Sequence, residues 1–91
     1  MVSSIALGAI GDAYLELGEI DDAISYYKKA AKNQENDLTS PMYLFKAGLV
    51  AEQLKKYDLA KSHFETIAVQ YPKSFYAKEK NLEAYIARNA Q

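Results

Sequence analysis

The sequence predicts an all-α fold made of stacked helix pairs. Apolar residues recur with the period of an α-helix along all 91 residues. One block of the chain also repeats 37 residues later, with large and small residues in the same places. The residues that correspond are Leu7 and Leu44, Gly11 and Gly48, Ile20 and Tyr57, Ala23 and Ala60, and Tyr27 and Phe64. Repeated units of this size are typical of helical hairpins that stack into one domain.

The first block predicts two helices. The first covers residues 3–17 and ends near Gly18, which suits the left-handed turn that closes a helix. The second covers residues 20–32, with acidic side chains near its start and lysines near its end, the order that the helix dipole favours. The polar stretch 33–39 is expected to be the longest loop.

The second block predicts a third helix that starts with Ser40 as N-cap and Pro41 in the first helical position. This helix continues to about residue 55, and a fourth covers 58–70 before the Tyr71-Pro72 pair stops it.

Ser74 is expected to cap a fifth helix that continues to about residue 89. Its charged side chains are typical of a terminal helix that shields a stack from water.

These residues resemble the tetratricopeptide repeat, a helix–turn–helix unit of about 34 residues. The matching positions in the first block are Leu7, Ile10, Gly11, Tyr14, Gly18, Ala23, Tyr27 and Ala30, and those in the second are Leu44, Gly48, Tyr57, Ala60, Phe64 and Pro72. Ala47 and Ala51 are smaller than the family's usual residues, and Ile67 replaces an alanine. The resemblance implies a right-handed stack with repeat one at about 4–37, repeat two at about 41–73 and a capping helix at about 75–89.

The resemblance also implies a protein–protein interaction scaffold that binds a peptide or helix. In such stacks the first helix of each pair lines a concave groove, so its outward residues are candidate contacts. The candidates are Ile5, Gly8, Asp12, Met42, Phe45, Lys46, Leu49, Glu52 and Tyr76. An apolar stripe at such spacing is also typical of a buried core, and this alternative stays open.

Some relatives grip a C-terminal carboxylate through lysine and asparagine side chains in this groove. The corresponding places hold Gly8, Asp12, Phe45 and Leu49, so an apolar or mixed peptide or helix is the favoured partner.

The first helix is apolar around its whole axis, which indicates that something covers it. An earlier repeat of a longer protein or a second copy of the chain would do so. The competing function is therefore self-association, as an assembly segment of a larger, membrane-anchored bacterial protein. The stretch 71–77 resembles a junction in bacterial cell-envelope members of the family, which favours an envelope location over the cytoplasm, although a proline turn with a serine cap also arises for local reasons.

Composition argues against several other functions. Eleven basic and 12 acidic residues give a net charge of −1, which provides no field for nucleic acid. There is no cysteine and one histidine, His63, which is expected on the surface of a convex helix. No metal site, cofactor or catalytic set of residues is therefore expected. No apolar run approaches the roughly 20 residues of a membrane span.

Overall fold

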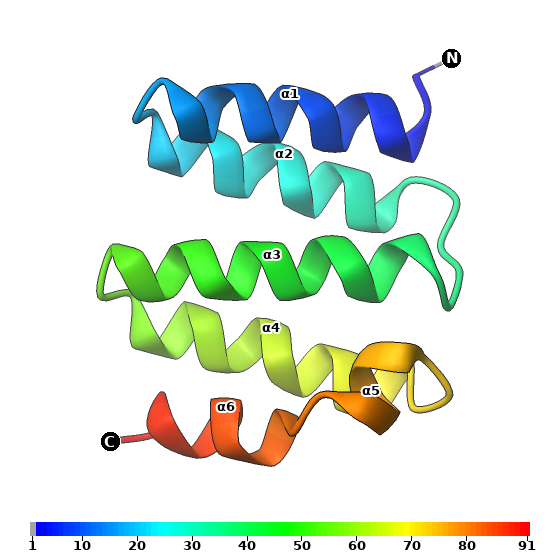
Figure 1. The fold of residues 1–91 in the computed structure, drawn as a ribbon, viewed down its shortest axis with the longest axis vertical. Coiled ribbons are helices and arrows are strands. Elements are labelled where there is room, and N and C mark those ends of the chain that lie inside the picture. Colours follow the sequence, from blue (N-terminus) through cyan, green and yellow to red (C-terminus); the bar gives the residue numbers. More distant parts are fainter. Residues whose placement is uncertain (1) are drawn as a thin grey trace.

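The computed structural model describes residues 2–91, and these residues form α-helices and no strand. The helices are α1 (Ser4–Glu16), α2 (Ile20–Lys32), α3 (Thr39–Gln53), α4 (Tyr57–Gln70), α5 (Phe75–Glu79) and α6 (Leu82–Arg88), shown in order in Figure 1. The all-α class predicted from the sequence is confirmed.

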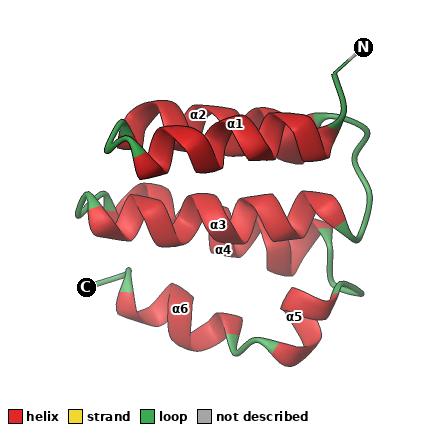
Figure 2. Cartoon of the chain, turned by 45° about the horizontal axis from the view of Figure 1, so that its top comes forward, coloured by secondary structure: helices red, strands yellow, loops and turns green. Residues whose placement is uncertain are grey.

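The first four helices form two antiparallel hairpins, α1–α2 and α3–α4, stacked side by side. Figure 2 shows α1 and α3 in one layer and α2 and α4 in the layer behind them. Helix α2 packs against α3 and so joins the two hairpins, while α6 covers the free side of α4. The core therefore runs along the stack, between the layers and between the hairpins.

Each hairpin closes around a glycine that faces an aromatic ring. A Cβ atom placed on Gly11 would lie 2.8 Å from Tyr27 Cδ1, and one on Gly48 would lie 2.6 Å from Phe64 Cε1. Both distances are shorter than van der Waals contact between carbon atoms, about 3.5–4.0 Å. Ala23 and Ala60 are fully buried in the same two hairpins. These small residues therefore allow the two helices of each hairpin to approach closely.

The start of α3 differs from the expected cap. The Asn36 side chain accepts hydrogen bonds at the helix start, from the backbone N–H groups of Leu38 (2.8 Å) and Thr39 (2.7 Å). The Ser40 hydroxyl accepts at 3.1 Å from the Asn36 N–H, which lies before the helix. Ser40 lies inside the first turn, where its hydroxyl donates to the Ala31 carbonyl at 2.6 Å. The prediction of Ser40 as N-cap is wrong, because its buried hydroxyl joins α3 to the end of α2 instead.

The chain after Ser74 forms two short helices in place of the single expected one. Ser74 caps α5 as predicted, accepting from the Ala77 N–H at 3.2 Å. Lys80 is extended, and the Asn81 side chain then starts α6 by accepting from the Ala84 N–H. Asparagine side chains compete with the helical backbone for hydrogen bonds, which favours a break here. The bend lets Leu82 bury its side chain.

Candidate partner-binding surface

Helices α1 and α3 lie side by side in the front layer, and a charged pair joins their exposed faces. Lys46 Nζ lies 3.3 Å from Asp12 Oδ1, and both side chains are about half exposed. The same Asp12 oxygen accepts a hydrogen bond from the Tyr27 hydroxyl. Burial and this carboxylate raise the pKa of Tyr27, so the phenol remains a neutral donor that fixes Asp12 in place.

Apolar side chains extend this surface on both helices. Ile5, near the start of α1, is 59% exposed. Met42 and Leu49 on α3 are half-buried and pack at the edge of the core. The structure thus leaves five of the predicted contact residues accessible to a partner, namely Ile5, Asp12, Met42, Lys46 and Leu49.

Gly8 and Phe45 were expected to face the groove, and the structure buries both. A Cβ on Gly8 would overlap the Tyr43 ring, which covers this part of α1. Phe45 is only 7% exposed, and its ring lies 5.1 Å from that of Tyr76 and 5.1 Å from that of Tyr85. Phe45 is therefore a core residue, because the C-terminal helices cover the face on which it lies.

The C-terminal end of the chain also forms hydrogen bonds with Glu52. Arg88 donates two hydrogen bonds of 2.7 Å to its carboxylate, and Asn89 Nδ2 donates a third at 2.7 Å. The hydrogen bond from Arg88 is the main cause that lowers the pKa of Glu52. Tyr76 is half-buried between Phe45 and Phe75. The end of the predicted groove near α5 and α6 is thus filled by the chain itself.

Comparison with protein-family models agrees with this architecture. Tetratricopeptide repeat models match residues 5–37 and 43–74, which coincide with the two hairpins. The chain belongs to the tetratricopeptide repeat family. Neither the curated proteins nor the solved structures include a significant match to the chain. Tetratricopeptide repeats generally mediate protein–protein interaction, and proteins built from them are typically non-catalytic scaffolds.

The opposite face of this tetratricopeptide domain, formed by α2 and α4, holds a buried histidine. His63 was expected on the surface, but it is only 6% exposed, because it lies in α4 where α2 and α3 pack alongside. Burial, together with the nearby Lys28 ammonium, lowers the pKa of His63 to about 4. The imidazole is therefore neutral at pH 7. Sequence reasoning missed it because a single histidine carries no periodic signal of its own.

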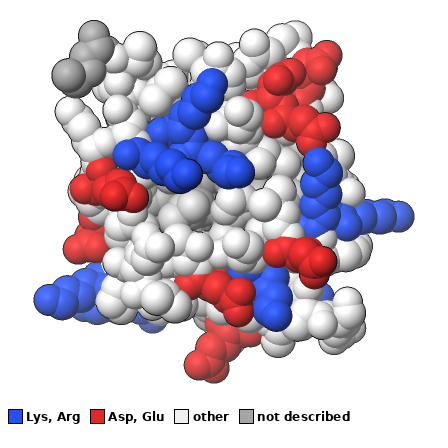
Figure 3. Space-filling model, turned by 180° about the vertical axis from the view of Figure 1, so that it is seen from behind, with Lys and Arg blue, Asp and Glu red and all other residues white. Residues whose placement is uncertain are grey.

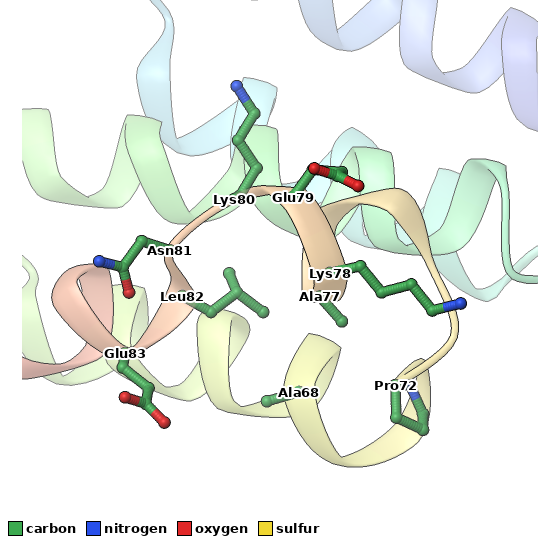
Figure 4. Close-up of a pocket in the computed structure, with 9 residues that line it drawn as sticks. All are labelled: Ala68, Pro72, Ala77, Lys78, Glu79, Lys80, Asn81, Leu82 and Glu83. Carbon is green, nitrogen blue, oxygen red and sulfur yellow. The ribbon is translucent and has the colours of Figure 1, made fainter.

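A hollow of about 520 Å³ lies where α5 and α6 meet the end of α4. Figure 4 shows Ala68, Ala77 and Leu82 on its inner side, with the charged ends of Lys78 and Glu83 directed outward. None of its lining residues carries a buried polar atom without a hydrogen-bond partner, so it is not a candidate site. Among residues 2–91, no three potential ligand side chains gather to hold a metal ion. None of the helices in this range has the length and apolar content needed to cross a bilayer.

Proposed function

We propose that this tetratricopeptide domain binds a peptide or helix of a partner protein on the exposed face of α1 and α3. The observation that carries the proposal is the Asp12–Lys46 ion pair, which lies between helices that also leave Ile5 exposed. A mixed surface of this kind suits a ligand with apolar side chains and at least one polar group. Exposed ion pairs contribute little to folding, about 0–1 kcal/mol, so these charges are free to serve specificity.

The proposed surface is restricted to the α1 end of the stack. Phe45 is buried and Glu52 is bound by Arg88, so neither supplies contacts unless the C-terminal helices detach. Ile5 and the Asp12–Lys46 pair are accessible without any rearrangement. A partner is therefore expected to engage Ile5, Met42 and Lys46 first.

Peptide selection tests this proposal. Peptides selected on the wild-type domain should bind the Ile5→Glu variant at least about tenfold more weakly, because a buried apolar contact is replaced by a charge. Val69→Glu is the matched control, since Val69 is also apolar and is even more exposed than Ile5, but lies on α4. Circular dichroism should show unchanged helicity in both variants. Selected peptides that lose affinity for Val69→Glu and not for Ile5→Glu would place the binding surface elsewhere.

A second candidate function is self-association through the outer face of α1. Leu17 is 74% exposed and Ile10 is also exposed. Both lie on the same side of α1 as three exposed alanines of this helix. An apolar face of this kind is typical of a stacking surface for another repeat or a second copy. Light scattering across a range of concentrations tests this candidate. A mass that stays monomeric at every concentration would contradict it, and Ile10→Glu should abolish any association that occurs.

The bacterial envelope location remains a proposal that rests on the resemblance of residues 71–77 to a junction in envelope proteins. Membrane anchorage of a larger parent protein belongs to the same proposal. Cell fractionation with an antibody against the domain tests both, and recovery in the cytoplasmic fraction alone would reject them.

A further inference from the structure

The face formed by α2 and α4 contains a cavity of about 370 Å³, on the opposite side from the proposed partner surface. This volume lies at the small end of the range for ligand pockets, roughly 300–1,000 Å³. Ala31, Leu44 and Leu59 provide apolar walls from three successive helices. Polar groups line the rest, among them Lys28, Lys32 and His63. The cavity therefore combines an apolar interior with a few polar groups, as ligand sites commonly do.

The imidazole of His63 is the unusual member of this lining. The side chain is more than nine-tenths buried, and its Nε2 atom has no hydrogen-bond partner among the described residues. Leaving a buried polar atom without a partner costs about 1–3 kcal/mol. That nitrogen has almost no accessible surface, but His63 is one of the residues that line the cavity, so an occupant can contact another part of the ring. A neutral imidazole keeps one N–H group that can donate to an oxygen atom.

The charged groups around the cavity indicate which charge a ligand bound there should carry. Helix α2 contributes the ammonium groups of Lys28 and Lys32, and the loop after it contributes Glu35. The hydroxyl of Tyr71, which follows α4, lies 3.4 Å from Glu35 Oε1 and can donate to it. Two lysines and one glutamate leave an excess of one positive charge, which matches a monoanion better than a dianion. Figure 3 shows basic side chains gathered near the middle of this face.

We propose that the cavity between α2 and α4 binds a small organic carboxylate with a short apolar body. The carboxylate would lie at Lys28 and Lys32 and accept a hydrogen bond from an N–H of His63, and the apolar body would contact Ala31, Leu44 and Leu59. Charge-assisted hydrogen bonds to lysine supply the specificity for the anion, and the apolar walls supply the preference for a carbon chain. This function is independent of partner binding on the opposite face.

Titration with hexanoate, followed by NMR, tests the proposal on the whole chain. Hexanoate should produce saturable shifts in the amide signals of residues 28–32 and 59–66. The ring signals of His63 should report a higher pKa when hexanoate is bound, because a nearby carboxylate favours the protonated imidazole. Acetate, which lacks the chain, and hexanamide, which lacks the charge, should each bind at least about tenfold more weakly.

Charge-matched variants separate the cavity from general electrostatics. The double variant Lys28→Gln/Lys32→Gln should bind hexanoate at least about tenfold more weakly than wild type. Lys29→Gln/Lys73→Gln removes the same charge from residues that do not line the cavity, and it should keep wild-type affinity. These lysines are exposed, so all the variants are expected to fold.

Several results would overturn the proposal. Shifts that do not saturate, or equal binding of hexanamide and hexanoate, would show that no carboxylate site exists. Tighter binding of inorganic phosphate than of hexanoate would identify a different class of ligand. An equal loss of affinity in both double variants would show that only the overall charge matters.

Discussion

Substitution of Gly48 by alanine tests the packing on which the fold depends. The added Cβ would lie 2.6 Å and 2.7 Å from two carbon atoms of the Phe64 ring, so the ring or the helix must move by about 1 Å to restore van der Waals contact. Phe64 cannot retreat easily, because it is fully buried and its ring centroid lies 5.5 Å from that of Phe45 and 5.2 Å from that of Tyr85.

Two opposing terms set the magnitude for Gly48→Ala. Overpacking of a tight core costs typically about 1–3 kcal/mol. Alanine is favoured over glycine inside a helix by about 1 kcal/mol, which offsets part of this cost. We therefore expect the free energy of unfolding to fall by about 1 kcal/mol, with a loss of roughly 4–8 °C in Tm for a domain of this size.

A double-mutant cycle measured by thermal and urea unfolding isolates the clash. In the Phe64→Leu background the ring is absent, so Gly48→Ala should be neutral or should stabilise the domain by up to about 1 kcal/mol. The coupling energy between the two sites then measures the close approach of α3 and α4. If Gly48→Ala stabilises the wild-type domain, or has the same effect in both backgrounds, the account of close packing is refuted.

Three further predictions concern polar groups and are checked by urea unfolding. Ser40→Ala removes a buried hydrogen bond to a carbonyl and should lower the free energy of unfolding by about 1–3 kcal/mol, whereas the exposed Ser25→Ala should have little effect. The pKa of His63 falls from 6.5 to about 4 on folding, so the free energy of unfolding should decrease as the pH falls from 6.5 towards 4. His63→Gln should remove this dependence on pH. An unchanged dependence in the variant would contradict the burial of the imidazole. The pKa of Glu52 is lowered on folding from its usual 4.5, chiefly by Arg88, so its contribution to stability is complete above pH 4.5 and is lost below it. Glu52→Gln should reduce the pH dependence of the free energy of unfolding in that acidic range. A dependence like that of wild type would argue against this ion pair.

The parts of the fold that could be predicted from the sequence depend on local patterns. Small residues recur among larger apolar ones at helical spacing, and the repetition of this pattern predicted two stacked helical hairpins. The turn at Gly18 was predictable too, because its φ of 79° is easily reached only without a side chain. The cap at Ser74 is likewise local, since it depends on a hydroxyl and an N–H three residues apart.

The features that could not be predicted depend on contacts between distant residues. An apolar stripe on α3 looks the same whether it lines a groove or a core, so the burial of Phe45 could not be read from its spacing. The break at Asn81 depends on the contact that Leu82 and Tyr85 gain elsewhere in the fold. The burial of His63 likewise depends on α2 and α3, which lie far from it in sequence.

The two ends of the stack therefore differ in physical character, and this difference directs where a partner can bind. At the α6 end, aromatic rings cover Phe45 and three hydrogen bonds hold Glu52, so the surface is satisfied internally. At the α1 end, Ile5 and Leu17 remain exposed to water and no helix of the described chain covers them. Burial of apolar area supplies most of the free energy of association. Both proposed modes of association, with a peptide or with another helical repeat, therefore converge on α1.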